Sequence, residues 1–296
     1  MQAGQPSRSP RVAQIRAMLP ITSIVMASDL TQRSTAALAR AVSLKEQLGA
    51  HLTVLHVLDA ATAPDQSEQL RRQAVEVLQA QLRSVVQDEQ RRLWMKVLEG
   101  EPDTTIVAEA IGTDLVILGD ARKPGWRERF VGTTTERVVR MSERPVLMVR
   151  RPADRPYQRL FSAFDGSAAS CRALSIGLGI ASAAQCLVMQ ANETRLLAEF
   201  TSRQAGNALV KRHLDTIMTQ LKTTLHAPLL AEPQVQIVEG YAHILIREGI
   251  RDFSPDLVVL GTHARSAAAT AFLGSFARDL LADTDCDVLI APPERS

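Results

Sequence analysis

The chain carries one pattern of strands, helices and turn residues twice. Residues 24–29 form an apolar run that ends in an aspartate, and residues 160–165 repeat it 136 positions later. Fifteen-residue loops, 119–133 and 261–275, follow a second kind of apolar run, and their start points lie 142 positions apart. A repeat of this length constrains the architecture before any local pattern is considered, because each copy must build a similar unit. We therefore expect two tandem domains of one fold.

Each copy alternates predicted strands with segments that suit helices. The strands are expected at 24–29, 51–57, 94–98, 114–118 and 145–149, and again at 160–165, 185–190, 235–238, 256–260 and 287–291. The helices between them include 66–92, 103–111, 193–226 and 242–252. This alternation predicts a parallel sheet with right-handed crossovers and helices on both faces. The predicted fold class is α/β, with two tandem five-stranded Rossmann-like domains.

Residues 152–156, Pro-Ala-Asp-Arg-Pro, are predicted to be a short stiff linker. The expected divisions are a disordered tail at 1–19, a first domain at 20–151 and a second at 152–296. In such a pair the two closing strands can pack against each other within one chain, which covers their free edges. The expected assembly is a pseudo-dimeric monomer, or a homodimer of it.

Composition favours a globular protein in a reducing setting. The 296 residues are 46% hydrophobic and 22% charged, and a net charge of +2 gives no reason to expect a nucleic-acid partner. Three cysteines without a C-x-x-C spacing indicate neither disulfides nor zinc, and the six histidines show no metal-ligand spacing. We expect a cytoplasmic location, although the Arg- and Ser-containing, acid-free lead also fits a transit peptide.

One uncharged stretch, residues 173–192, approaches the length of a membrane span. The corresponding residues of the first copy carry charges, so a helix followed by a buried strand explains both copies. No membrane partner is expected.

The glycine loops are the strongest candidates for a binding site. Glycine lets a backbone approach a ligand closely, and the amide groups at a helix N-terminus attract phosphate. In a parallel sheet, ligands bind at the carboxyl ends of the strands where the strand order reverses. The loops and the strand-end aspartates all fall at that edge.

The loops resemble those of the universal stress protein family, whose nucleotide-binding members carry G-x2-G-x9-G-[S/T] after the fourth strand and an Asp at the end of the first. Here the pattern reads Gly119-x2-Arg122-x9-Gly132-Thr133 and Gly261-x2-Ala264-x9-Gly274-Ser275. The spacing is intact in both copies, but the second glycine is missing from both. The resemblance covers nearly the whole chain after the tail, and the second half is most similar to tandem members of the E type.

The resemblance implies ATP or another adenine nucleotide as ligand, with Mg²⁺ able to accompany it, whereas the fold itself needs no cofactor. The implied nucleotide-binding positions are Asp29, Val57, Gly119, Arg122, Gly132, Thr133 and Thr134 in the first half, and Asp165, Ala191, Gly261, Ala264, Gly274, Ser275 and Phe276 in the second. Ala264 adds one methyl group at the missing glycine. Arg122 either fills the pocket or joins Lys123, Arg127 and Arg129 as a phosphate clamp. The second half is favoured as the nucleotide site.

The same residues also allow purely structural interpretations. The glycines can simply shape a loop and cap a helix, and Asp29 and Asp165 can be helix caps. Ser167, Ser170 and Cys171 lack a nucleophile-elbow pattern and fit a helix start better. His56 is expected to be structural.

The function implied by the resemblance is a cytoplasmic stress-response protein that binds a nucleotide without efficient turnover, and so not an enzyme. The alternative is a nucleotide-independent module with degenerate loops that binds proteins or a lipid-like molecule. A slow ATPase is a third interpretation, which fold analogy alone would not support.

Overall fold

The structure is a computed structural model that describes residues 21–59, 64–85, 93–120, 133–152, 154–192, 232–262 and 275–294, together with 211, 212, 215, 216 and 219. Its first half contains β1 (Ser23–Ala27), α1 (Gln32–Leu48), β2 (His51–Asp59), α2 (Pro64–Val85), β3 (Leu93–Gly100), α3 (Pro102–Ala110), β4 (Leu115–Gly119), α4 (Thr134–Met141) and β5 (Val146–Val149). Its second half contains β6 (Arg159–Ala163), α5 (Ala168–Ile180), β7 (Gln185–Asn192), β8 (Gln234–Glu239), α7 (Ala242–Phe253), β9 (Leu257–Gly261), α8 (Ser275–Asp283) and β10 (Asp287–Ala291).

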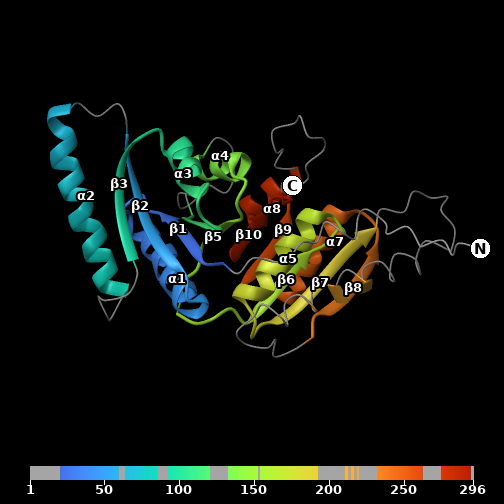
Figure 1. The fold of residues 1–296 in the computed structure, drawn as a ribbon. Coiled ribbons are helices and arrows are strands. Elements are labelled where there is room, and N and C mark those ends of the chain that lie inside the picture. The colour runs from blue at the N-terminus through green and yellow to red at the C-terminus, as the bar shows by residue number, and fades with distance from the viewer. Residues whose placement is uncertain are drawn as a thin grey trace, which may run out of the picture.

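The strands form one ten-stranded sheet in the order β3-β2-β1-β4-β5-β10-β9-β6-β7-β8. Every neighbouring pair within a half is parallel, and β5 and β10 meet in an antiparallel pair at the centre, with Leu147 opposite Leu289 (Figure 1). The α/β class with two tandem units predicted from sequence is confirmed, and the closing strands β5 and β10 pair within the chain as expected.

Two hydrophobic cores cover the two faces of the sheet. One core joins the sheet to α1, α2 and α5, and the other joins it to α3, α4, α7 and α8. The central strands β4, β5, β9 and β10 are almost entirely buried, because helices cover them on both sides.

The predicted elements recur with shifted ends. The second strands run two residues further than expected, to Asp59 and Asn192, and the first strands stop two residues before Asp29 and Asp165. The uncharged stretch 173–192 is the end of α5 followed by β7, as predicted. Among the described residues no helix combines the length and the apolar character needed to cross a membrane. The end of the expected helix 66–92, beyond residue 85, lies outside the described residues, as does nearly all of the segment 193–226.

An aspartate at the start of a strand, or just before it, fixes the neighbouring strand in three places. Asp114 accepts hydrogen bonds from the backbone N–H groups of Thr22 and Ser23 at 2.9 and 3.0 Å. Asp256 accepts them in the same way from Gln158 and Arg159 at 2.8 and 2.9 Å. Asp114 and Asp256 are 142 residues apart, the same offset as the glycine loops, so this device is part of the repeat.

Asp287 is the third of these aspartates and holds the two halves together. Its Oδ1 accepts the N–H groups of Arg150 at 2.8 Å and Arg151 at 3.1 Å, at the end of β5. Its Oδ2 accepts the Tyr157 hydroxyl at 2.6 Å and lies 3.5 Å from Nε of Arg40, which is on α1. The Arg40 guanidinium also lies over the Tyr157 ring, 3.9 Å from its centroid. The carboxylate of Asp287 is therefore held by three groups of the first half and by Tyr157, which follows the linker.

This cluster is buried, which makes its charges interdependent. The side chain of Asp287 has no exposed surface and that of Arg40 is 5% exposed. Burial raises the pKa of Asp287, and this effect outweighs the lowering by its hydrogen bonds. Removing one partner from a buried ion pair leaves the other charge uncompensated, whereas removing both is far less harmful.

We expect Asp287→Asn to lower the free energy of unfolding at pH 7 by about 3 kcal/mol, because Arg40 then keeps a buried and unpaired charge. The double variant Arg40→Met, Asp287→Asn should recover part of that loss. Urea denaturation measures both values. Asp114→Asn is the matched control and should cost about 1 kcal/mol, since its bonds lie at a partly exposed strand end. Equal losses in the three variants would contradict the role given to Asp287.

Candidate functional site

The candidate site is the crevice at the carboxyl ends of the central strands. In the first half, β1 lies between β2 and β4, and the chain leaves β1 and β4 towards opposite faces of the sheet. In the second half β6 has the same place between β7 and β9. Ala27 pairs with Leu118 and Ala163 with Leu260, which brings each strand-end aspartate beside the glycine that begins each loop. This is the strand-order reversal at which open parallel sheets bind ligands.

Asp29 lies in a tight turn before α1 and is largely exposed. Its Oδ1 accepts the N–H of Thr31 at 3.0 Å, the Thr31 hydroxyl at 2.7 Å and the Ser34 hydroxyl. Partial burial raises the pKa of this carboxyl, but the hydrogen bonds from Ser34 and Thr31 outweigh it and hold the pKa below its ordinary value. Asp29 therefore stays ionised at neutral pH and fixes the turn that leads into α1. The N-cap residue of α1 is Thr31, so the interpretation of Asp29 as the helix cap is wrong.

The turn at Asp29 is held from two other elements, β2 and α2. Nδ1 of His56, on β2, lies 2.8 Å from the Ser28 carbonyl oxygen, which fits the structural role expected for this histidine. Nε2 of Gln81, on α2, donates to the carbonyl oxygens of Leu30 at 3.2 Å and Thr31 at 3.1 Å. Sequence reasoning missed Gln81, because it lies outside the repeated pattern and only the folded chain brings it to the turn. It also missed Ser34, although Ser34 corresponds to Ser170 in the repeat and lies five residues from Asp29.

Leu30 adopts a backbone conformation that is unusual for its type. Its φ is 62°, and Gly166, the residue after Asp165, has a φ of 74°. The two halves thus use the same left-handed turn, with glycine in one and leucine in the other. A leucine here is strained by the contact of its Cβ with the backbone, and the hydrogen bonds from Gln81 hold the turn in place.

Asp165 lies in the corresponding turn before α5, and the cap of this helix is Ser167 rather than Asp165. Its Oδ1 accepts the N–H of Ser167 at 2.9 Å, and the Ser167 hydroxyl oxygen accepts the N–H of Ser170 at 3.1 Å. Ser167 and Ser170 thus begin α5, as the helix-start interpretation predicted. Burial raises the pKa of the Cys171 thiol to about 11, so this residue is protonated at neutral pH and is not an activated nucleophile.

Val57 and Ala191 lie inside β2 and β7, and their backbones face the crevice. The carbonyl oxygen of Leu55 accepts the N–H of Ser28 at 2.8 Å, so the backbone of Leu55 faces β1. Alternate residues of a strand present their backbone groups to the same side, so Val57 faces that side beyond the end of β1. In the second half the carbonyl oxygen of Met189 accepts the N–H of Phe164 at 2.9 Å. Ala191, two residues further along β7, therefore faces the same side beyond the end of β6.

The first glycines of the two loops have different surroundings. A Cβ on Gly261 would come within 2.5 Å of the backbone carbon of Ala169, at the start of α5. A Cβ on Gly119 would meet the Arg33 carbonyl oxygen at 3.6 Å, an ordinary contact. Gly261 is therefore required by the close packing of α5 on β9, which supports the structural interpretation for this glycine.

The far ends of the loops begin helices. Thr133 caps α4 by accepting the N–H of Glu136 at 3.1 Å, and Thr134 is the first helical residue. Ser275 and Phe276 begin α8, at the same point of the repeat. Arg122, Gly132, Ala264 and Gly274 lie outside the described residues, as do Lys123, Arg127 and Arg129. Among the described residues, no three His, Cys, Asp or Glu side chains are placed to hold a metal ion.

A model of the universal stress protein family matches residues 20–150 and again residues 156–292. The chain belongs to the universal stress protein family. Universal stress protein MJ0531 of Methanocaldococcus jannaschii is 26% identical over 140 residues, which make up 44% of this chain and 82% of that protein. The domain limits expected from sequence, 20–151 and 152–296, stay a prediction.

Solved structures of the family share the tandem fold. A universal stress protein from Archaeoglobus fulgidus is similar over 92% of this chain and 98% of its own, with a TM-score of 0.70 and 15% identity. A putative universal stress protein from Pseudomonas aeruginosa is similar over 93% and 94%, with a TM-score of 0.63 and 21% identity. These similarities show that the whole two-unit architecture recurs in the family.

In this tandem universal stress protein we expect Gly261→Ala to lower the free energy of unfolding by about 2 kcal/mol, because the added methyl group would overlap the α5 backbone. The matched variant Gly119→Ala should change it by less than about 0.5 kcal/mol. Urea denaturation of both variants decides the question, and equal effects would refute the difference in packing.

We expect Asp29→Asn to destabilise the protein by about 1 kcal/mol at pH 7, because hydrogen bonds to a charged acceptor are the stronger ones. A pKa that is lower in the folded state gives stability above the unfolded-state pKa, and this stability is lost as the pH falls through the folded-state value. The difference between the wild type and the variant should therefore shrink as the pH is lowered from 7 to 2.5 in urea titrations. A difference independent of pH would show that the charge of Asp29 plays no part.

Proposed function

We propose that the protein is a stress-response protein that binds an adenine nucleotide such as ATP in the strand-end crevice. The observation that carries the proposal is the same in both halves: an exposed aspartate lies beside an outward-facing strand backbone and a glycine loop that leads into a helix. The position is the one at which this class of sheet binds ligands.

The nucleoside would lie between the aspartate and the end of the second strand. Oδ1 of Asp29 is engaged with Thr31 and Ser34, which fixes the direction of the carboxylate and leaves Oδ2 to accept a ribose hydroxyl. The backbone of Val57, facing beyond the end of β1, supplies a donor and an acceptor for the edge of a base. Asp165 and Ala191 offer the same pair in the second half.

The phosphates would lie at the start of α4 or α8. The N-terminus of a helix attracts anions through its free N–H groups and its dipole. The Thr133 hydroxyl oxygen accepts the N–H of Glu136, which places this hydroxyl at the helix N-terminus where a phosphate would lie. When Mg²⁺ accompanies the nucleotide, it would neutralise charge on these phosphates.

We propose a bound ligand rather than a substrate. The described crevice contributes backbone groups, a hydroxyl and a carboxylate that already accepts three hydrogen bonds, and such groups bind and orient. ATP incubated with the protein and Mg²⁺ should therefore release phosphate no faster than ATP alone. Phosphate release that stops in Asp29→Ala would instead assign an ATPase to the first half.

Thermal denaturation with ATP and AMP tests binding directly. A ligand that binds only the folded state stabilises it by RT ln(1 + [L]/Kd), about 2.7 kcal/mol at a hundredfold excess over Kd. We expect both nucleotides to raise Tm, and ATP more than AMP because of its additional phosphates. No shift at millimolar concentrations of either would overturn the proposal and favour the nucleotide-independent interaction module.

Two single variants locate the site, each compared with its own ligand-free Tm. Asp29→Ala removes the carboxylate of the first half, and Asp165→Ala removes that of the second. The nucleotide-induced shift should disappear in the variant of the half that binds and persist in the other. A shift that survives in the double variant would remove both aspartates from nucleotide binding.

A further inference from the structure

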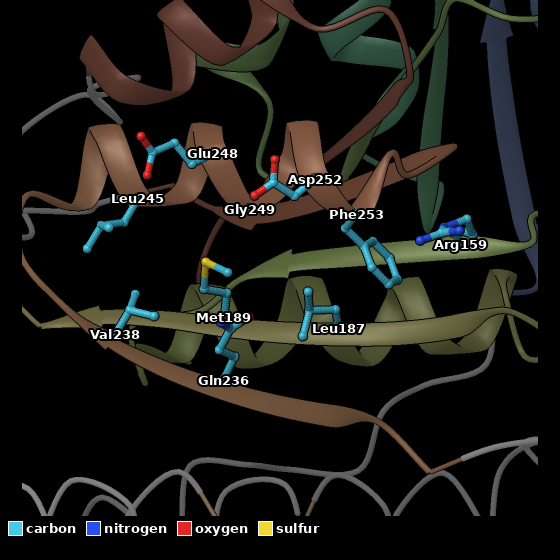
Figure 2. Close-up of a pocket in the computed structure, with 10 residues that line it drawn as sticks. All are labelled: Arg159, Leu187, Met189, Gln236, Val238, Leu245, Glu248, Gly249, Asp252 and Phe253. Carbon is cyan, nitrogen blue, oxygen red and sulfur yellow. The ribbon is translucent and has the colours of Figure 1, made fainter.

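A pocket lies on the outer side of the second half, away from the strand-end crevice. Its volume is about 350 Å³, within the range of small-molecule sites, and it lies between α7 and the strands β7 and β8. Figure 2 shows Leu187 and Met189 rising from β7, with Leu245 and Phe253 reaching down from α7. These side chains form the apolar part of a pocket that polar side chains also line.

The rim on the helix side of this pocket is acidic. Glu248 and Asp252 are four residues apart on α7, line the pocket and are exposed to solvent (Figure 2). Oδ1 of Asp252 lies 3.3 Å from Nε of the exposed Arg251, so an ammonium group would share this carboxylate with Arg251. Arg159 lies at the other end, with its guanidinium 4.5 Å from the centroid of the Phe253 ring. A ligand along the pocket would thus meet the Arg159 guanidinium, stacked on the Phe253 ring, at one end. On the helix side it would meet the carboxylates of Glu248 and Asp252.

In the first half, an ion pair occupies the position that corresponds to this pocket. Lys96 on β3 pairs with Leu55, and Gln236 on β8 pairs with Met189, at matching positions of the repeat. Nζ of Lys96 lies 2.7 Å from Oε2 of Glu109, which is the eighth residue of α3. In the first half, an alkyl chain that ends in an ammonium group thus crosses from the outer strand to a carboxylate on the helix.

The second half lacks both members of that pair. Gln236 replaces the lysine, and Gly249, the eighth residue of α7, replaces the glutamate. A Cβ on Gly249 would come within 2.5 Å of Cε of Met189, so the glycine lets α7 lie close over the methionine. The carboxylates are instead at Glu248 and Asp252, next to the missing glutamate position on the same helix.

We infer that this pocket binds a small primary alkylamine, whose chain takes the place of the Lys96 side chain and whose ammonium group pairs with Glu248 and Asp252. The aliphatic chain would pack on Leu187, Met189 and Val238, which removes apolar surface from water. The ammonium group gains charge-assisted hydrogen bonds that an alcohol or a carboxylate of the same length cannot make. The inference concerns a different site from the nucleotide crevice and does not depend on it.

Hexylamine is the probe, and NMR of methionine methyl groups labelled with ¹³C is the readout. Met189 lies in the pocket, and the Met189→Leu variant assigns its resonance. Hexylamine should shift this resonance in a saturable way, while hexan-1-ol and hexanoate at the same concentrations should not. An equal shift with all three compounds would overturn the inference. So would the absence of a saturable shift up to about 10 mM hexylamine, since a Kd of about 10 mM corresponds to less than about 3 kcal/mol of binding free energy.

Variants test the assigned partners of the amine. Glu248→Gln with Asp252→Asn should weaken hexylamine binding at least about tenfold, since the ammonium loses its counter-charge. Glu109→Gln, which neutralises the carboxylate of the corresponding helix, is the matched control and should leave binding unchanged. Gln236→Lys should block hexylamine by supplying the missing side chain. Unchanged affinity in the double variant would exclude the acidic rim from recognition.

Discussion

The contact between β5 and β10 is the constraint on which the rest of the structure depends. A five-stranded parallel sheet has two free edges, and this antiparallel pair covers one edge of each half with the other half. Asp287 fixes the pair at the cost of burying a carboxylate, and that cost is offset only because Arg150, Arg151, Tyr157 and Arg40 all meet it. These partners come from the end of β5, from Tyr157 just after the linker and from α1 of the first half. The two halves repeat one fold, and buried polar contacts join them.

The two copies have kept the same backbone while their side chains have diverged at two places. At the crevice, the first half anchors a strained turn through His56 and Gln81, whereas the second uses Gly166 and packs α5 tightly on Gly261. On the outer face, a lysine and a glutamate close the first half, and a glutamine and a glycine leave the second open. A duplicated chain tolerates such differences between its copies, because the shared sheet depends on the central strands of each copy.

Much of the architecture could be predicted from the sequence, because apolar runs and glycine spacing are local signals that the repeat doubles. The strands, their order along the chain and the position of the aspartates beside the loops follow from those signals. The Arg40–Asp287 pair could not be predicted, since 247 residues separate its members and an arginine within a helix pattern looks like a surface charge. Gln81 was missed for a similar reason, and the outer pocket depends on the register of β8 against β7, which the sequence does not state. Arg122 and Ala264, on which the loop predictions turned, lie outside the described residues.

The antiparallel junction also decides how two bound ligands would relate to each other. Strands of the first half run one way along the common sheet and those of the second half run the other way, so their carboxyl ends emerge at opposite borders. Two occupied crevices would lie on opposite sides of the molecule, too far apart to share a phosphate, a metal ion or a covering loop. Between the two crevices lie the β5–β10 pair, the buried charges beside it and the contact of α1 with α5, where Gln47 Nε2 donates to the Ile180 carbonyl oxygen at 3.2 Å.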